Sequence, residues 1–400
     1  MVAVFSTPRG NTYDPMPVEL WRYDGTGAVG RLETAEKLEF TWADRTTGTA
    51  VLETPLTNLT RMLLDKSGET LVVATFNGKR HVSTVVESEV FAHGDQQEDV
   101  RVRAVCASPW SMLEGQRIPP VPDQPLSLQQ SAEFFTMTGP VETVVKTLLG
   151  HGARRVGHPI QIREDLRRGP IVTVKARNDT TADLVSELLA GTGFRLALDA
   201  WLPGDPKIGQ LSLTAPTIIA DVVPYREQPG LVWASASHDL DDWGLTYKRP
   251  QTTRMVVGDK GEKTSQAFVS VTSRDEPASP WARREGYVEA SGEETPADRG
   301  AAELVKSAGS VDLDATATPS QIWEFGSDGQ YPRQFDVGDW VTVDLGDVGV
   351  VRQVITEVTV TLTPVSLTIV PKVATPDTAA RDLYSLVTDL DKRLDRAQRR

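Results

Sequence analysis

Apolar and polar residues alternate with a short period in the first 115 residues of this chain. Apolar side chains recur there at every second position or in short runs, a pattern typical of strands that bury one or both faces. The Asn77-Gly78 pair between two such runs indicates a tight hairpin. We therefore predict a barrel-like β domain with strands at Leu38–Trp42, Thr49–Glu53, Leu71–Phe76, His81–Val86 and Val100–Cys106.

A second pattern, with a period near 3.6, follows a stretch rich in proline at residues 116–125. Pro140 begins one predicted helix and Gly150 ends it. Thr180 or Thr181 caps another, and Gly191 lies past its end. Each helix is followed by a glycine turn and an extended segment, at Arg154–Val156 and Phe194–Ala200. These residues predict a small α/β domain after a linker.

Strand patterns return from residue 211 onward. The predicted strands are Leu211–Thr214, Leu231–Ala234, Met255–Val257, Ala267–Thr272, Trp340–Leu345, Gly349–Thr361 and Val365–Val370, with a helix inserted at 296–308. We accordingly predict five segments: a first barrel-like β domain (1–115), a proline-rich linker (116–125), an α/β domain (126–210), a second barrel-like β domain (211–372) and a C-terminal amphipathic helix (373–400).

The C-terminal helix carries an apolar stripe at the spacing of a coiled coil. Between the stripe positions the sequence is charged, so the rest of the helix surface is solvated. Such a helix is about three heptads long and too polar to cross a bilayer. It either associates with copies or partners, or folds back on its own domain. The seam, which is our candidate interaction site, is formed by Ala380, Leu383, Val387, Leu390, Leu394 and Ala397.

The charge balance limits the classes of partner. A formal net charge of −13 and a pI near 5.0 argue against a surface built to neutralise phosphates or anionic lipid. A channel that lets DNA pass without sticking would be acidic, although the charge would equally serve solubility. We find no export signal and no run long enough for a membrane span.

Candidate chemistry is sparse. The single cysteine, Cys106, lies in an apolar run and predicts a buried thiol, and it excludes an intrachain disulfide. His81 alternates with strand residues, which predicts a surface or cross-strand position, and His151 and His158 have no zinc-ligand spacing. The acidic residues after His238 lack the glycine and glutamate of a calcium loop. The motifs GxSxG and GxxxxGK[ST] are absent. The run Gly25-Thr26-Gly27-Ala28-Val29-Gly30 has the spacing GxGxxG, but it neither follows an apolar strand nor opens a clear helix, so it predicts a hairpin turn. We predict no catalytic residue, cofactor or metal.

Several short motifs occur in a fixed order over most of residues 20–372. They are Gly30-Arg31-Leu32, Leu38-Glu39-Phe40-Thr41, Met255-Val256-Val257-Gly258, the segment Trp281–Glu289, Ala302-Glu303-Leu304, Phe335–Val341 with its Val337-Gly338-Asp339 turn, and Arg352–Val358. In their order and spacing, more than in any one motif, the chain resembles the tail-hub, or minor tail, proteins of actinobacterial siphophages.

The resemblance implies an α+β, mainly β, multidomain tail-hub fold, similar to the baseplate hubs of contractile phages. Three copies would close a ring at the distal tip of a long non-contractile tail, in the virion. The implied partners are the distal tail protein or tail tube, the tape-measure protein and downstream receptor-binding proteins, with DNA only in passage and no stable membrane association. No catalytic residues carry over.

A rival reading from another class is a β-rich carbohydrate-active enzyme or carbohydrate-binding module. Its sugar platforms would come from Trp21, Trp110, Trp201, Trp233, Trp243 or Trp281.

Overall fold

A computed structural model describes residues 5–6, 12–13 and 16–374, except 34, 66, 93–99, 210–211, 260–264, 275, 291–294, 318–322 and 327–332. The chain divides into two compact units. Unit 1 comprises residues up to 243 and from 315 onward, and unit 2 comprises Gly244–Asp314.

The first barrel-like part of unit 1 is an antiparallel sheet in the order β5-β6-β9-β8-β7-β3-β4. All five strands predicted in this region are present. A short pair, β1 (Phe5–Ser6) and β2 (Thr12–Tyr13), precedes the sheet. Its strands are β3 (Val18–Arg22), β4 (Ala28–Arg31), β5 (Lys37–Ala43), β6 (Thr49–Pro55), β7 (Thr70–Phe76), β8 (Lys79–Ala92) and β9 (Val100–Ala107).

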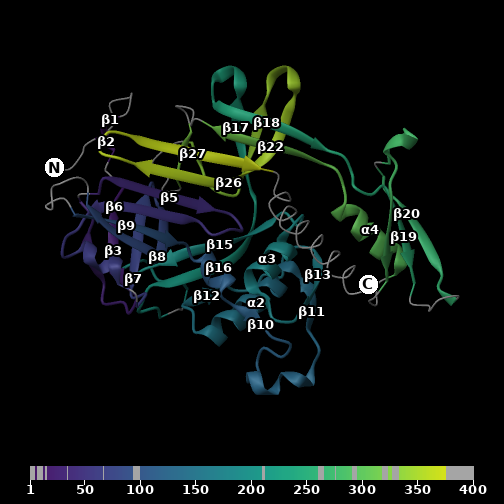
Figure 1. Ribbon diagram of the computed structural model, residues 1–400, viewed down its shortest axis with the longest axis horizontal. Coiled ribbons are helices and arrows are strands. Elements are labelled where there is room, and N and C mark those ends of the chain that lie inside the picture. Colours follow the sequence, from purple (N-terminus) through teal and green to yellow (C-terminus); the bar gives the residue numbers. More distant parts are fainter. Residues whose placement is uncertain are drawn as a thin grey trace. The chain divides into compact units, whose positions relative to one another are not determined.

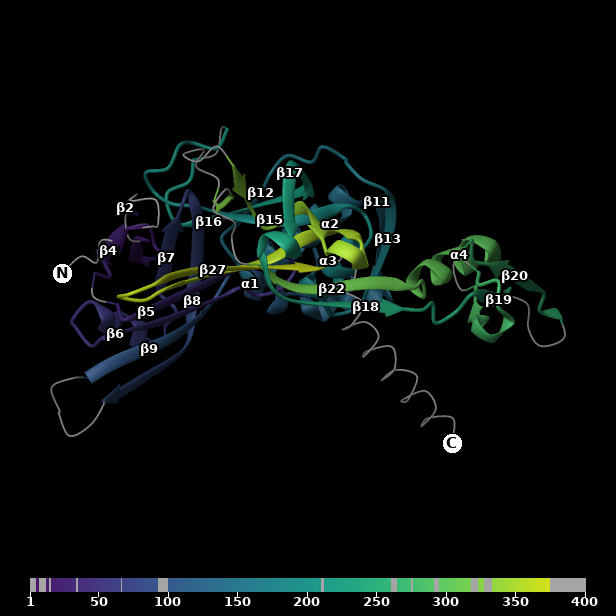
Figure 2. The same ribbon diagram turned by 90° about the horizontal axis from the view of Figure 1, so that it is seen from above.

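The predicted hairpin at Asn77-Gly78 joins β7 to β8. Both residues have positive φ, 42° and 75°, as a two-residue turn that follows the twist of the strands requires. At their far ends β8 and β9 extend outward (Figure 2); there β8 pairs with β9 but no longer with β7, and β9 stays paired with β6 as far as Pro55. The register of the β8–β9 pair shifts between Val85 and Glu87, so Val86 is the extra residue of a bulge.

The middle of unit 1 packs helices against short sheets (Figure 1). Its core combines α2 residues Val145, Leu148 and Leu149 with Val185 and Leu189 of α3. The elements are α1 (Trp110–Glu114), β10 (Arg117–Ile118), β11 (Phe135–Pro140), α2 (Val141–Val156), β12 (Ile160–Ile162), β13 (Ile171–Ala176), β14 (Asp179–Thr180), α3 (Thr181–Leu189), β15 (Phe194–Trp201) and β16 (Thr217–Pro224).

Two boundaries in this region were predicted wrongly. The first helix does not end at Gly150 but continues through the expected extended segment to Val156. Gly157, in the left-handed conformation, is the true stop, and its N–H donates to the carbonyl of Ala153. Leu211–Thr214 is not a strand where it is described, and the strand begins instead at Thr217.

The α3 boundaries agree with the prediction. The Thr180 hydroxyl accepts a hydrogen bond from the N–H of Asp183, which satisfies a donor in the first turn. Gly191 lies just past the end of the helix with a φ of 70°.

The second barrel-like part continues the same sheet. The strand β26 pairs antiparallel with β5 through six residue pairs, Glu357↔Ala43 to Leu362↔Leu38 (Figure 1). Segments more than 300 residues apart in the sequence are thereby joined. Its strands are β17 (Arg226–Ala234), β18 (Leu240–Lys248), β22 (Ser310–Ala317), β23 (Glu324–Phe325), β24 (Gln334–Phe335), β25 (Asp339–Asp344), β26 (Val350–Leu362) and β27 (Leu367–Ala374).

Unit 2 is a three-stranded sheet with one helix on it. The sheet order is β20-β19-β21, formed by β19 (Arg254–Gly258), β20 (Phe268–Thr272) and β21 (Glu285–Glu289). The helix α4 (Pro296–Lys306) packs Leu304 into a core with Met255, Val257 and Ala290. The helix was predicted from the sequence.

The predicted fold class, α+β and mainly β, is confirmed. No helix in the described ranges is long and apolar enough to span a bilayer. The C-terminal helix (373–400) lies outside the described residues beyond Ala374.

Candidate functional site

The six predicted seam residues, Ala380, Leu383, Val387, Leu390, Leu394 and Ala397, lie outside the described residues and stay a prediction. The described part of the chain offers a second candidate, the junction where the two barrel-like parts and the α/β region of unit 1 meet. We call this region the barrel junction, and define it by the turn Asp336–Asp339 and the residues that contact it.

The turn at Asp336–Asp339 contains the Val-Gly-Asp motif noted in the sequence. The N–H of Asp336 donates to Oδ2 of Asp339 at 2.8 Å, and the N–H of Asp339 donates to the carbonyl of Asp336 at 3.1 Å. Gly338 has a φ of 90°. A Cβ at this position would lie 2.2 Å from Nε of Arg195 on β15, so only glycine lets the α/β region approach this closely.

Asp339 ties the start of β25 to the start of β17. Its side chain is buried and forms a two-point ion pair with Arg226, whose Nε donates to Oδ1 at 2.7 Å. Burial raises the pKa of Asp339, against the opposing effect of Arg226. Hydrogen bonding to this carboxylate raises the pKa of Arg226.

The β7–β8 hairpin of the first barrel-like part reaches the same turn. Nζ of Lys79 donates to Oδ2 of Asp336 at 2.7 Å. Nδ2 of Asn77 donates to the carbonyl of Phe325 at 2.9 Å. The hairpin that the sequence predicted therefore joins the two barrel-like parts as well as two strands.

A buried tyrosine makes a third connection. The hydroxyl of Tyr225, just before β17, donates to Oδ2 of Asp44, just after β5, at 2.7 Å. Burial raises the pKa of Tyr225, and the neighbouring Asp44 carboxylate raises it further. Nε of Arg45 lies 3.4 Å from the same carboxylate oxygen.

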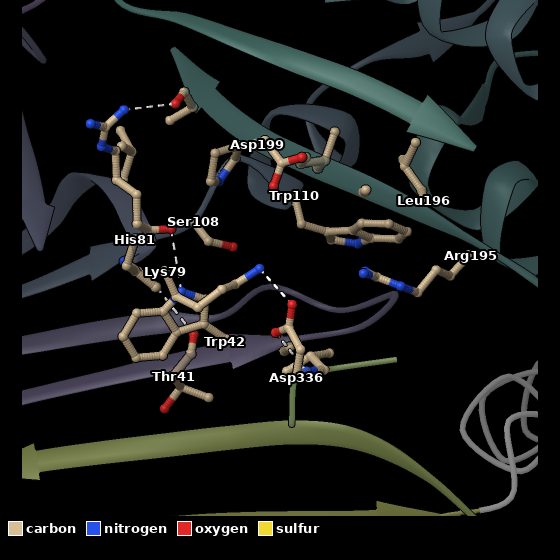
Figure 3. A pocket seen from close by; sticks show the side chains of 18 residues that line it. Thr41, Trp42, Lys79, His81, Ser108, Trp110, Arg195, Leu196, Asp199 and Asp336 are labelled. Carbon is tan, nitrogen blue, oxygen red and sulfur yellow. Dashed lines mark hydrogen bonds and ion pairs between the residues drawn. The ribbon is translucent and has the colours of Figure 1, made fainter. Parts of the chain in front are cut away.

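A small cleft opens at the barrel junction (Figure 3). It has a volume of about 100 Å³, enough for a few water molecules. Its charged groups are largely engaged: Lys79 binds Asp336, and Arg80 binds Asp205 outside the cleft. Ser108 accepts from the N–H of Gly48 and His81 contacts the carbonyl of Thr41, so no hydrogen bond joins this serine to this histidine. The arrangement suits a structural joint better than acid–base or nucleophilic chemistry.

Residues 17–371 match the model of a family described as Siphovirus ReqiPepy6 Gp37-like protein. The chain belongs to this family. The predicted resemblance to siphophage tail proteins is therefore confirmed. None of the curated proteins compared with the sequence matches it.

Solved structures resemble this siphovirus family member over nearly their whole length. The 43 kDa tail protein of prophage MuSo2 from Shewanella oneidensis is 12% identical, with a TM-score of 0.55 over 91% of this chain and 99% of that one. Prophage tail protein gp18 from Listeria monocytogenes EGD-e is 10% identical, with a TM-score of 0.53 over 95% of this chain and 99% of that one. The tail protein from Neisseria meningitidis MC58 is 10% identical, with a TM-score of 0.51, and the match covers 90% of this chain and 98% of that one. The chain thus has the fold of phage tail proteins.

The histidines that the sequence analysis considered have structural partners in this protein. Nδ1 of His151 lies 3.2 Å from Asp123, and Nδ1 of His158 lies 2.8 Å from Nε2 of Gln116. His81 is buried on β8 opposite Ala74 of β7, so of the two expected positions the cross-strand one is confirmed and the surface one is wrong. Cys106 is buried as predicted, and burial raises its thiol pKa to about 12. The described residues contain no group of three His, Cys, Asp or Glu placed to hold a metal ion.

The six tryptophans considered as sugar platforms differ in exposure. Trp110, Trp201 and Trp233 are buried and serve the core, and Nε1 of Trp21 donates to Glu19. Trp243 is 39% exposed, whereas Trp281 is 97% exposed. Of the six tryptophans, only Trp281 exposes nearly its whole side chain to solvent.

Sequence reasoning found the turn at the barrel junction but missed its partners. Lys79, Arg195 and Arg226 are ordinary basic residues at strand ends, and their roles depend on which strands become neighbours. No local signal distinguishes them from solvated surface charges.

Proposed function

We propose that this protein is a homotrimeric hub at the distal tip of a long non-contractile phage tail. It is a structural component of the virion tail, as its family and fold indicate. In the proposed role it joins the tail tube to the receptor-binding and tip proteins and bounds the channel through which DNA leaves.

The observation that carries this proposal is the β5–β26 ladder. It joins two barrel-like parts of one chain in a single hydrogen-bonded sheet. The barrel junction reinforces it through the Lys79–Asp336 and Tyr225–Asp44 contacts. Three such chains supply six barrel-like parts, which would match a six-fold tube on one side and a three-fold tip on the other.

Exposed apolar side chains on the second barrel-like part support an assembled state. Val232 on β17, Val350 on β26 and the neighbouring Val348 are 44%, 67% and 50% exposed. On the same three-stranded face the guanidinium of Arg352 lies 4.7 Å from the centroid of the Trp340 ring. Aromatic and arginine residues next to exposed aliphatic ones are typical of protein interfaces.

The partners follow from this role. We propose contacts with the distal tail protein or tail tube, the tape-measure protein and downstream tip proteins, with DNA only in passage. A net charge of −13 would keep passing DNA from adhering to the channel.

The oligomeric state tests the proposal. Light scattering and mass photometry of the purified full chain, alone and with the neighbouring tail proteins, should give a trimer of about 131 kDa, three times the chain mass of 43.7 kDa. Electron microscopy of the virion, with an antibody fragment on this chain, should place it at the tail tip. A chain that stays monomeric under all these conditions, or labels another part of the virion, would contradict the hub.

The carbohydrate-active alternative makes a different prediction. It requires a monomer that cleaves or binds cell-wall glycan and loses this activity on carboxylate-to-amide substitution. Glycan release from purified cell walls measures it directly.

A further inference from the structure

The α/β region of unit 1 differs in charge from the chain as a whole. Residues 116–200 contain about as many Lys and Arg as Asp and Glu, whereas the whole chain has 42 basic against 55 acidic residues. The net charge of −13 therefore conceals a region that can carry a local basic surface. The structure shows such a surface on β13 and the elements next to it.

The outer face of the β11–β13 hairpin carries two cations beside an aromatic ring. Nζ of Lys175 lies 4.0 Å from the centroid of the Phe134 ring, and Cζ of Arg177 lies 5.9 Å from it. Lys175 and Arg177 are two residues apart in extended chain, so their side chains leave the same face. The opposite face, with Met137 and Val174, packs on the core. Both cations are exposed to solvent.

Hydrogen bonds continue this surface to β10 and the end of α2. Nη1 of Arg117 on β10 lies 3.5 Å from the carbonyl oxygen of Asn178, the residue after Arg177. Nη2 of Arg155 donates to the carbonyl of Arg117 at 2.9 Å. Both arginines are exposed. We call Arg117, Arg155, Lys175 and Arg177 the basic strip.

The positive charge of the basic strip is not neutralised by its surroundings. In the part of the chain that the structure describes, none of its four cations has an ion-pair partner. The carboxylate of Asp179 lies close by, but it accepts from the backbone N–H of Arg177 at 2.7 Å. By contrast Arg154, next to Arg155 in the sequence, is paired with Asp123. The strip therefore retains an excess of positive charge in an acidic chain.

The side chains around the basic strip suit a phosphate backbone. The ring of Phe134 is capped by Lys175, so it offers no free platform for a base or for the apolar centre of a protein interface. Thr136, directly opposite Lys175, and Thr173 add hydroxyl groups on the same face. Ile171, which is 68% exposed, lies at the other end of β13. Exposed cations and hydroxyls are the groups that contact the phosphates of DNA without reading its sequence.

We propose that the basic strip contacts the phosphate backbone of duplex DNA, independently of sequence. Contacts of this kind have dissociation constants of about 10⁻⁴ to 10⁻⁶ M at physiological salt, so they let DNA move on. The inference rests on the proposed function only for the source of the DNA, which is the genome leaving the particle. Binding itself is a property of the chain and can be measured without the particle.

The salt dependence of binding tests the strip in the full chain. Fluorescence anisotropy of a labelled duplex of about 30 base pairs, between about 50 and 200 mM NaCl, gives the slope of log K against log salt. Four phosphate contacts should give a slope of about −3.6, and removal of one cation should reduce its magnitude by about 0.9. The variants are Arg117→Gln, Arg155→Gln, Lys175→Gln and Arg177→Gln.

Matched variants separate the strip from charge in general. Lys175→Gln with Arg177→Gln should weaken binding at about 0.1 M salt by tenfold or more. Arg177→Lys keeps the charge and should keep the slope. Arg61→Gln and Lys207→Gln remove exposed cations elsewhere in unit 1 and should leave binding unchanged. Thermal unfolding shows that each variant is folded.

Crosslinking tests the contact in the particle. Because Cys106 is buried, a photo-crosslinker attached to Thr136→Cys reports on the strip, and one attached to Lys207→Cys is its control. Both variants enter virions by complementation of a phage that lacks the gene. In virions triggered to release their genome, the first should crosslink to DNA and the second should not.

The outcomes distinguish this site from the hub. A salt slope that the four substitutions leave unchanged, or crosslinking that does not differ between the two thiols, would overturn the DNA contact. If strip variants bind DNA like the natural chain but fail to enter virions, the strip meets carboxylates of a neighbouring protein and our assignment is wrong. A chain that stays monomeric but binds DNA through the strip would reject the hub and leave the site intact.

Discussion

His81 is a histidine kept neutral by its surroundings. Its ring lies 5.3 Å, centroid to centroid, from both Phe40 and Trp42, and Nε2 lies 3.1 Å from the carbonyl of Thr41. Burial lowers its pKa to about 4, from 6.5 in an unfolded chain. The unfolded chain therefore binds a proton between these pH values that the folded chain does not bind.

We predict that acid weakens the fold through this residue. As the pH falls from 6.5 to about 4, the free energy of unfolding should decrease by about 1.4 kcal/mol per pH unit from His81 alone. His81→Phe should flatten this part of the pH profile, measured by urea unfolding. His238→Gln, in an exposed turn, is the control that should keep the slope, and an unchanged profile in His81→Phe would contradict the assignment.

Glu142 on α2 is the centre of a buried ion network. Its carboxylate accepts from Lys146 at 2.7 Å and from Nε of Arg168 at 2.9 Å, and Lys146 also contacts Asp221. Burial would raise the pKa of Glu142, but the hydrogen bonds from Arg168 and Lys146 outweigh it and lower the pKa to about 2.

Glu142→Gln should therefore cost about 3 kcal/mol of unfolding free energy at neutral pH, because it leaves Lys146 buried with fewer counter-charges. In the natural chain the Glu142 contribution is complete above pH 4.5 and disappears as the pH falls toward 2. Urea unfolding at several pH values measures both effects. Glu142→Gln combined with Lys146→Met should recover part of the loss, and no recovery would show that the cost is not electrostatic.

For single residues, the sequence predicted few of the burial states and contacts that the structure shows. Cys106 was recognised as buried because its neighbours are apolar. His81 was not, since strand alternation shows which residues share a face but not which face becomes covered. The members of the Glu142 ion network come from segments up to 79 residues away from Glu142, and only the fold brings them together.

At the scale of elements, two glycines separate backbone strain from steric contact. Gly157, which ends α2, has a φ of 81°, and a Cβ there would meet no atom within 4 Å. Gly338, at the barrel junction, has a φ of 90°, and a Cβ there would collide with Arg195.

Gly157→Ala should cost about 1 kcal/mol of unfolding free energy through strain alone. Gly338→Ala should cost clearly more, because Arg195 must also move away from the turn. Thermal and urea unfolding of the two variants gives the comparison directly. Equal losses would mean that Arg195 adapts freely and that the close approach at Gly338 is unimportant.

The seam of the C-terminal helix remains a prediction from spacing. If Ala380, Leu383, Val387, Leu390, Leu394 and Ala397 form a three-fold coiled coil, Leu390→Asp should weaken trimer formation by tenfold or more, because a charge would be buried in the seam. Asp389→Ser, outside the seam, is the control. A Leu390→Asp chain that trimerises normally would favour the helix folding back on its own domain. Mass photometry distinguishes these results.

Strands bounded by clear turns were the most predictable elements. The pattern around Asn77-Gly78 gave the β7–β8 hairpin because both turn residues are strongly selected by their conformation. Gly150 misled the prediction of the α2 boundary, since a glycine inside a helix is tolerated and the left-handed stop came seven residues later. The strands β18 and β22 were not predicted, although apolar residues alternate with other residues in both.

At the scale of the whole molecule, order along the chain carried more information than composition. The spaced motifs led to the siphovirus family, and the family match over residues 17–371 confirmed it. No local pattern indicated that β5 and β26 would pair, because pairing across more than 300 residues depends on the complete topology. The barrel junction is therefore a site that only the three-dimensional structure reveals.

The β5–β26 ladder also sets the order of events during synthesis. The strand β5 is synthesised early, whereas β26 is complete only after residue 362. At about 5–20 residues per second, β5 therefore remains without its β26 partner for on the order of half a minute. A prematurely terminated polypeptide would retain an open, adhesive edge at β5. Only a chain translated past residue 362 can therefore close this edge completely.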